Sequence, residues 1–191
     1  MSSRRLLRRG GLRKALPMRI APVVFAALFA VAPPVLAQPR QAASPQAAKP
    51  EGPKPLGTFQ DWVAATSSEG GQPVCYAFTR AKPAGAVPGR GEVMLTVTQR
   101  AALRDAVSIA AGFAFAANAE VKVEAGPASL DFYTSQRSAF AREGAKAVAA
   151  LSRAAQATAK SPGPRGAVTD SFSLKGFSQA YAAISKACPA K

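Results

Sequence analysis

From Leu56 onward, apolar residues alternate with polar ones in short runs that Gly, Pro, Ser and Asn interrupt. The alternating positions are Val74, Tyr76 and Phe78; Val93, Leu95 and Val97; Val107, Ile109, Phe113 and Phe115; Val121 and Val123; Leu130 and Phe132; and Phe172 and Leu174. A period of two places such residues on one face of a β-strand. The spacing therefore predicts antiparallel strands that pack on one side or in two layers.

Two segments have helical spacing instead. Glu143 to Ala159 is rich in alanine, carries Val148, Leu151 and Ala155 on one face, and ends before Pro162. The last segment has a single apolar face that consists of Phe177, Tyr181, Ile184 and Cys188. Because these residues follow one another at i, i+4, i+7 and i+11, we expect a C-terminal helix that turns Cys188 toward the core.

The first 37 residues have the pattern of a secretory signal. Seven basic residues and no acidic one occupy the first twenty positions, namely Arg4, Arg5, Arg8, Arg9, Arg13, Lys14 and Arg19. An uncharged apolar run follows from Ala21 to Leu36, and the small residue Ala37 closes it. The order basic, apolar, small is typical of a signal peptide. Sixteen residues interrupted by Pro33 and Pro34 are too few to span about 30 Å, so we expect cleavage and no transmembrane span afterwards.

The export route and the true start stay open. Ser3-Arg4-Arg5-Leu6-Leu7 is similar to a twin-arginine signal, although the apolar run begins far downstream of it. Met18-Arg19 and the same apolar run would form a complete shorter signal. Both alternatives predict an exported protein.

The mature chain divides into a spacer and one domain. Residues 38–55 consist largely of Pro, Ala, Gln and Lys without a large apolar side chain. Such a segment buries too little surface to offset the entropy lost on ordering, so we interpret it as a disordered spacer. Residues 56–191 are enough for a single hydrophobic core.

Composition excludes several kinds of chemistry. The chain has 25 Lys and Arg against 10 Asp and Glu, but removal of residues 1–37 lowers the net charge to +8, and we do not expect nucleic acid as the partner. It contains no histidine, which removes imidazole bases and ordinary zinc sites. The two cysteines cannot form a tetrathiolate site and lack CxxC spacing. We therefore predict no metal and no cofactor.

Cys75 and Cys188 are expected to form a disulfide. Two cysteines in a small exported domain meet an oxidising compartment, where they usually pair. In the chain-entropy model, a disulfide that closes the long loop between Cys75 and Cys188 stabilises the folded state by up to about 4 to 5 kcal/mol. The alternative is two separate buried thiols. A catalytic thiol is not expected, because no nearby base would activate either sulfur.

The sequence contains one weak catalytic motif. Gly176-Phe177-Ser178-Gln179-Ala180 is similar to a nucleophile elbow, but without histidine Ser178 has no usual base. A pairing with Lys175 or Lys186 is the remaining catalytic interpretation. We favour the start of a helix and predict no catalytic residue.

Other prominent side chains have structural interpretations. Trp62, the only tryptophan, is expected in the core. Six carboxylates show no spacing that would assign acid and base roles: Asp61, Asp105, Glu120, Glu124, Asp131 and Asp170. Five basic residues follow the first strands: Arg80, Lys82, Arg90, Arg100 and Arg104. They would attract anionic surfaces, although simple solvated charge is the favoured interpretation.

Several blocks of the domain form a distinctive set of motifs: Leu56-Gly57-Thr58-Phe59-Gln60-Asp61-Trp62; Gly70-Gly71 before Val74-Cys75-Tyr76-Ala77; Val107-Ser108-Ile109 leading to Gly112; and Arg165-Gly166 with Thr169-Asp170-Ser171-Phe172-Ser173-Leu174-Lys175-Gly176-Phe177-Ser178 and a closing Cys188. Together these blocks resemble the invasion-associated locus B family of exported alphaproteobacterial proteins. The resemblance extends over about residues 56–188, and the last block is its most specific part. The chain departs from the family at Phe140, where tryptophan is usual, and at Ala167, where threonine is usual.

The resemblance implies a mainly β, immunoglobulin-like antiparallel β-sandwich with an Ala-rich helix and a C-terminal helix. It also implies a non-enzymatic protein of the periplasm, the outer membrane or the secreted fraction, and it brings no catalytic residue to carry over. We expect the domain to act by binding an envelope or host protein or an anionic envelope surface. The alternatives are a serine hydrolase that uses Ser178 and a periplasmic carrier of a small molecule.

Overall fold

The computed structural model describes residues 52–82, 87 and 89–190. The expected signal peptide and most of the expected spacer lie outside the described residues. The described part contains β1 (Lys54–Phe59), β2 (Trp62–Glu69), β3 (Gln72–Arg80), β4 (Met94–Arg100), β5 (Ala106–Ala110), β6 (Glu120–Ala125), β7 (Ala128–Ser135), β8 (Ser138–Ala141), α1 (Gly144–Leu151), β9 (Gln156–Gly163), β10 (Gly166–Ser173) and α2 (Phe177–Ala187). The mainly β fold with two helices is confirmed.

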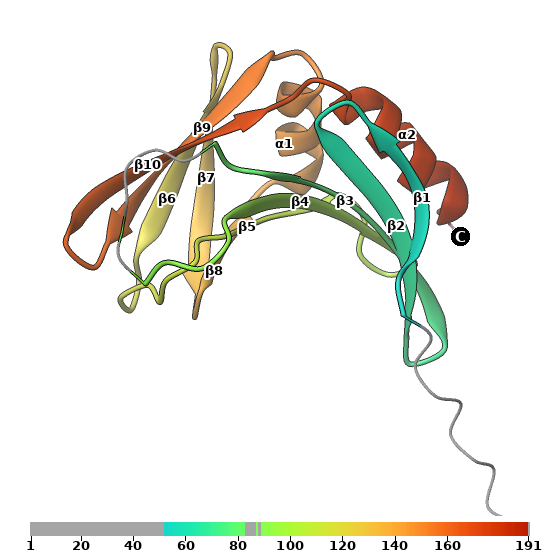
Figure 1. Cartoon of the computed structure of the whole chain (residues 1–191), viewed down its shortest axis with the longest axis horizontal. Helices are drawn as coiled ribbons and strands as arrows, with labels where there is room; N and C mark the ends of the chain where they lie inside the picture. The colour runs from blue at the N-terminus through green and yellow to red at the C-terminus, as the bar shows by residue number, and fades with distance from the viewer. Residues whose placement is uncertain (1–51, 83–86, 88, 191) are drawn as a thin grey trace, which may run out of the picture. The chain divides into compact units, whose positions relative to one another are not determined.

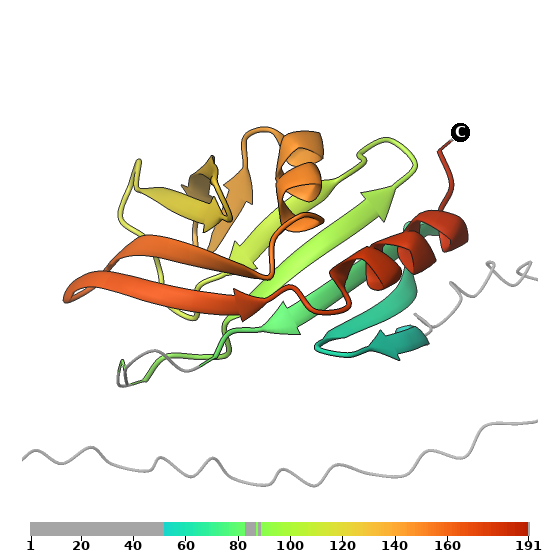
Figure 2. The ribbon, with the colours of Figure 1, turned by 90° about the horizontal axis from the view of Figure 1, so that it is seen from above.

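The ten described strands form one antiparallel sheet in the order β1-β2-β3-β4-β5-β8-β7-β6-β9-β10. Tight hairpins connect most neighbours; in β1–β2, for example, only Gln60 and Asp61 separate the paired residues Phe59 and Trp62. The sheet bends so that β6, β7, β9 and β10 cross the direction of β3 and β4, which is consistent with a sandwich whose layers belong to one sheet (Figure 1). Both helices lie on the same side of β3, β4 and β5 (Figure 2).

The bend brings the edge strand β10 back to the beginning of the sheet. The amide of Lys82, just after β3, donates to the carbonyl of Ser171 at 2.8 Å. The indole Nε1 of Trp62 donates to the carbonyl of Ser173 at 3.0 Å. Because these contacts satisfy outward groups of β10, much of its C-terminal half is not an open edge.

A single core fills the space between the sheet and the helices. Trp62, Leu95, Ile109, Phe132 and Phe172 are completely or almost completely buried. The expected face of α2 is confirmed, since its buried residues Phe177 and Ile184 pack on this core and the rings of Trp62 and Phe177 lie 4.9 Å apart. Trp62 is therefore a core residue, as predicted.

The helix expected over Glu143–Ala159 is wrong in its second half. Helix α1 ends at Leu151, and residues Gln156–Gly163 form β9, in which Ala157, Ala159 and Ser161 are buried in alternation. Alanine is compatible with the helical period and with the period of two of a strand. Here β9 pairs with β6 on one side and with β10 on the other. Tertiary packing, not local propensity, therefore determines that this segment forms a strand.

The structure corrects one strand expectation, because Phe113 and Phe115 lie outside the strand that contains Val107 and Ile109, and it adds detail to two other strands. The strand that contains Val107 and Ile109 ends at Ala110, because Gly112 has a φ of 77° and a Cβ at that position would overlap the carbonyl of Gly91. In β3 the buried residues include Cys75, Ala77 and Thr79, whereas Tyr76 and Phe78 lie on the partly exposed face. Strand β1 begins at Lys54, two residues before the expected start of the domain.

Candidate functional site

The cysteine pair links the middle of the sheet to the last helix. Cys75 lies in β3, and Cys188 is the residue that directly follows α2. The structure places the two residues as a disulfide with Cα atoms 5.9 Å apart and with both side chains buried. Arg104 donates from Nη1 to the carbonyl of Cys188 at 2.5 Å, so the β4–β5 connection also holds this end of α2.

A polar cluster lies beside the cysteines. Asp105 accepts hydrogen bonds from the amide of Gln99 at 2.6 Å and from the hydroxyl of Tyr181 at 2.7 Å. Gln99 is fully buried and accepts in turn from the backbone amide of Asp105. Burial raises the pKa of Tyr181, and the hydrogen bond to Asp105 adds to this rise. The cluster thus fixes the β4–β5 turn against α2 and has a structural role.

Asp170 of the most specific sequence block forms a buried ion pair. Its carboxylate accepts from both terminal nitrogens of Arg90, at 2.8 and 2.7 Å. The third donor of Arg90, Nε, reaches the carbonyl of Ala111 at 2.7 Å, and the guanidinium lies 5.0 Å from the centre of the Phe113 ring. Each of the three guanidinium nitrogens of Arg90 donates a hydrogen bond, so this pair joins β10 to the loops that precede β4 and follow β5.

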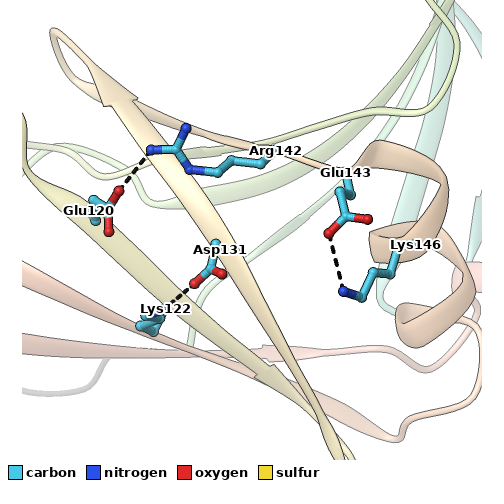
Figure 3. A network of polar contacts seen from close by, with 6 residues as sticks. All are labelled: Glu120, Lys122, Asp131, Arg142, Glu143 and Lys146. Carbon is cyan, nitrogen blue, oxygen red and sulfur yellow. Dashed lines mark hydrogen bonds and ion pairs between the residues drawn. The ribbon is translucent and has the colours of Figure 1, made fainter.

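The outer face of β6, β7 and β9 carries a ladder of exposed ion pairs. Glu120 pairs with Arg142, Lys122 with Asp131, and Glu124 with Lys160. Glu143 and Lys146 form a further pair at the start of α1, and Figure 3 shows these two residues next to the first two pairs of the ladder. Their charges cancel locally. Three of the six carboxylates that show no functional spacing in the sequence, Glu120, Glu124 and Asp131, are therefore paired here with cations and not with one another.

Excess positive charge lies elsewhere on the surface. Arg80 and Arg100 are paired with Glu92 and Glu69. Within the described residues, five cationic side chains have no carboxylate partner and no other side-chain hydrogen bond: Lys82, Arg153, Arg165, Lys175 and Lys186. The five basic residues that the sequence groups after the first strands are thus divided among a buried pair, two exposed pairs, a backbone contact and one unpaired ammonium at Lys82.

A groove of about 240 Å³ lies where β2, β3 and β10 meet, and we call it the β2–β3 groove. It is lined by Asp61, Val63, Phe78, Thr79, Arg80, Lys82 and Ser173. Val63 and Phe78 are directly paired across β2 and β3. The period of two placed Phe78 on one face of a strand but did not indicate whether that face is covered, so the sequence did not predict this groove. The signal that could have revealed it is the alternation of Cys75 and Ala77 on the opposite face of the same strand.

Ser178 lies exposed in the first turn of α2. The glycine of its motif has a structural explanation, because Gly176 has a φ of 88° and a Cβ there would overlap the carbonyl of Phe59. Within the described residues, the Ser178 hydroxyl has no hydrogen-bond partner. The structure thus supports the start of a helix and brings neither Lys175 nor Lys186 to this serine.

Searches of the described residues gave two further results. They contain no group of three or more Cys, Asp or Glu side chains arranged to hold a metal ion. None of their helices has the length and apolar character needed to cross a membrane.

Comparisons with known proteins give one structural similarity. No protein-family model and no curated protein matches the chain. The fold is similar to the crystal structure of invasion associated protein B from Bartonella henselae, with a TM-score of 0.49 and 17% sequence identity. The match covers 69% of this chain and 97% of that one. The name of that protein is the name of the family that the sequence motifs resemble.

Proposed function

We propose that this chain is an exported, non-catalytic protein of the invasion-associated locus B type that acts by binding in the periplasm or at the outer envelope. Three features support the proposal: the signal-like pattern of residues 1–37, the motif blocks of the domain, and the placement of Cys75 and Cys188 as a disulfide. The binding partner is an anionic envelope surface or an acidic envelope or host protein.

The distribution of charge carries this proposal. The described residues include fifteen Lys and Arg but nine Asp and Glu, and among those nine only Asp61 lacks an ion pair or hydrogen bond to its carboxylate. Nearly all of the described carboxylates are therefore paired within the domain, and the excess of Lys and Arg side chains stays without carboxylate partners on the surface. Such an excess attracts anionic surfaces over a screening length of about 8 to 10 Å at physiological salt.

The test is salt-dependent binding to envelope material. The mature protein should sediment with outer-membrane fragments or with phosphatidylglycerol vesicles at low salt and be released as the salt concentration rises. A triple variant with Arg153, Lys175 and Lys186 replaced by Ser should bind less.

The matched control removes one pair of the ladder, with Lys122→Ser and Asp131→Ser together, and should bind as the unmodified protein does. Absence of binding at low salt, or equal loss in the control, would contradict the proposal.

The two alternatives gain no support from specific contacts. A hydrolase needs a base at Ser178, and no described side chain provides one by hydrogen bonding. A carrier needs space between the strands and α2, where Trp62, Phe177 and Ile184 instead form part of the packed core.

A further inference from the structure

Two opposite charges without ion-pair partners line the β2–β3 groove. Among the described residues, the carboxylate of Asp61 and the ammonium of Lys82 form neither an ion pair with one another nor a hydrogen bond with another side chain. Each is thus available to a ligand. A group that carries one positive and one negative charge would complement both.

Hydrogen bonds hold the backbone at both positions. Asp61 occupies the two-residue turn between β1 and β2, and its amide donates to the carbonyl of Lys175 at 3.3 Å. The amide of Lys82 donates to Ser171 at 2.8 Å in the bridge to β10. The two charges therefore approach the groove from different, fixed elements, which lowers the cost of ordering them around a ligand.

The remaining charge of the groove is already neutralised. The guanidinium of Arg80 pairs with Glu92 at 2.5 Å and lies 5.5 Å from the centre of the Phe78 ring. This leaves one cation and one anion for a ligand. A purely anionic group would be repelled by Asp61, and a purely cationic group by Lys82, so the groove favours a dipolar one.

The size of the groove limits what it holds. At about 240 Å³ it is smaller than the roughly 300 to 1,000 Å³ of pockets that enclose whole drug-sized ligands. It fits one end of a larger molecule, such as a lipid headgroup. Val63 and Phe78 present apolar surface to the methylene groups that separate the two charges of such a headgroup.

We propose that the β2–β3 groove binds the phosphoethanolamine headgroup of a membrane lipid, with the phosphate at Lys82 and the primary ammonium at Asp61. A primary ammonium donates hydrogen bonds to a carboxylate, whereas the quaternary ammonium of choline has no N–H to donate. The groove therefore selects ethanolamine over choline headgroups. This inference depends on the proposed envelope role only for the source of the lipid.

The test compares two vesicle compositions with the same minor fraction of phosphatidylglycerol. The remaining lipid is phosphatidylcholine in one set and an equimolar mixture of phosphatidylethanolamine and phosphatidylcholine in the other. The mature protein should bind the ethanolamine-containing vesicles about two- to fivefold more tightly, the range expected for an exposed charge pair. Because salt also weakens an exposed charge pair, the two vesicle sets are compared at the same low salt concentration, where they share the contribution of phosphatidylglycerol.

Variants assign the effect to the groove. Asp61→Asn should abolish the preference for ethanolamine, and Lys82→Met should weaken binding to both vesicle sets because both headgroups carry the phosphate. Glu143→Gln and Arg165→Met change the net charge equally at exposed positions outside the groove and should retain the preference. In NMR titrations, soluble O-phosphoethanolamine should shift the amides of Asp61, Val63 and Lys82, whereas phosphocholine, which shares only the phosphate, should leave the amide of Asp61 unshifted.

Equal binding to both vesicle sets, or NMR shifts confined to other residues, would overturn the headgroup assignment. Equal loss of the preference in the control variants would do so as well. A protein that binds phosphatidylglycerol vesicles in a salt-dependent manner but shows no ethanolamine preference would retain the proposed function and lose only this inference. Failure to bind any vesicle or envelope fraction at low salt would contradict the proposed function instead.

Discussion

Arg90 and Asp170, 80 residues apart in the chain, form a two-point ion pair that is buried on both sides. The pair satisfies the only carboxylate of β10 and ties that strand to the loop before β4. The fold tolerates this buried pair because each charge has its counter-charge and hydrogen-bond partners beside it.

Asp170→Asn should destabilise the domain by about 3 to 5 kcal/mol, because it leaves the guanidinium of Arg90 buried without a counter-charge. Urea unfolding followed by the fluorescence of Trp62 measures this loss. Asp131→Asn, which breaks an exposed pair, is the control and should cost less than about 1 kcal/mol. Similar losses of unfolding free energy in the two variants would show that the buried pair stabilises the domain no more than an exposed pair does.

Replacement of both Cys75 and Cys188 by Ser should lower the free energy of unfolding by about 2 to 5 kcal/mol. The cross-link limits the unfolded chain, and its loss also frees the end of α2 that Arg104 holds. Unfolding of the oxidised protein, the reduced protein and the double variant gives the comparison. The reduced protein should match the double variant. Two free thiols in the protein recovered from the periplasm would contradict the predicted bridge.

Gly176→Ala should destabilise the domain by at least about 2 kcal/mol, since the backbone has a positive φ and the added Cβ meets the carbonyl of Phe59. Ser178→Ala, two residues further on, should change stability by less than about 0.5 kcal/mol because this side chain is exposed. Thermal unfolding compares the two variants. A fluorophosphonate probe should leave Ser178 unlabelled, and labelling there would favour the hydrolase alternative.

The hydrogen bond from Lys122 lowers the pKa of Asp131, and the positive charge of Lys122 contributes to the same shift. A carboxyl whose pKa is lower in the folded state stabilises the fold above its ordinary pKa, and this contribution is lost as the pH falls through the folded value. NMR titration of the Asp131 carboxyl should therefore give a pKa below its usual range. Lys122→Met should raise that pKa, and an unchanged value would show that the pair does not persist in solution.

Local patterns were sufficient for most strands and for α2. Leu95 with Val97, Val121 with Val123, and Leu130 with Phe132 are buried in alternation, as the period of two indicated. These side chains are large enough that only one face of each strand can receive them. The apolar face of α2 was equally clear, and it placed Cys188 where Cys75 could reach it.

Patterns failed where the decisive contact is distant in sequence. The alanines of β9 match a helix or a strand equally well, and pairing with β6 and β10 decides between them. In β3, Tyr76 and Phe78 are the larger side chains, yet the close approach of α2 admits only Cys75 and Ala77 on its side. Asp61 and Lys82, the two groove residues without ion-pair partners, adjoin β2 and β3, and the pairing of these strands brings them to one groove.

The contacts of Trp62 with Ser173 and of Cys75 with Cys188 separate partners by 111 and 113 residues. The core contacts of Trp62 and Cys75 can therefore form only after the final segment of the polypeptide has been made. Loop closure over such distances is slow compared with local structure formation. A nascent chain that still lacks its last segment can form neither contact, so this part of the core is completed only after synthesis of the whole domain.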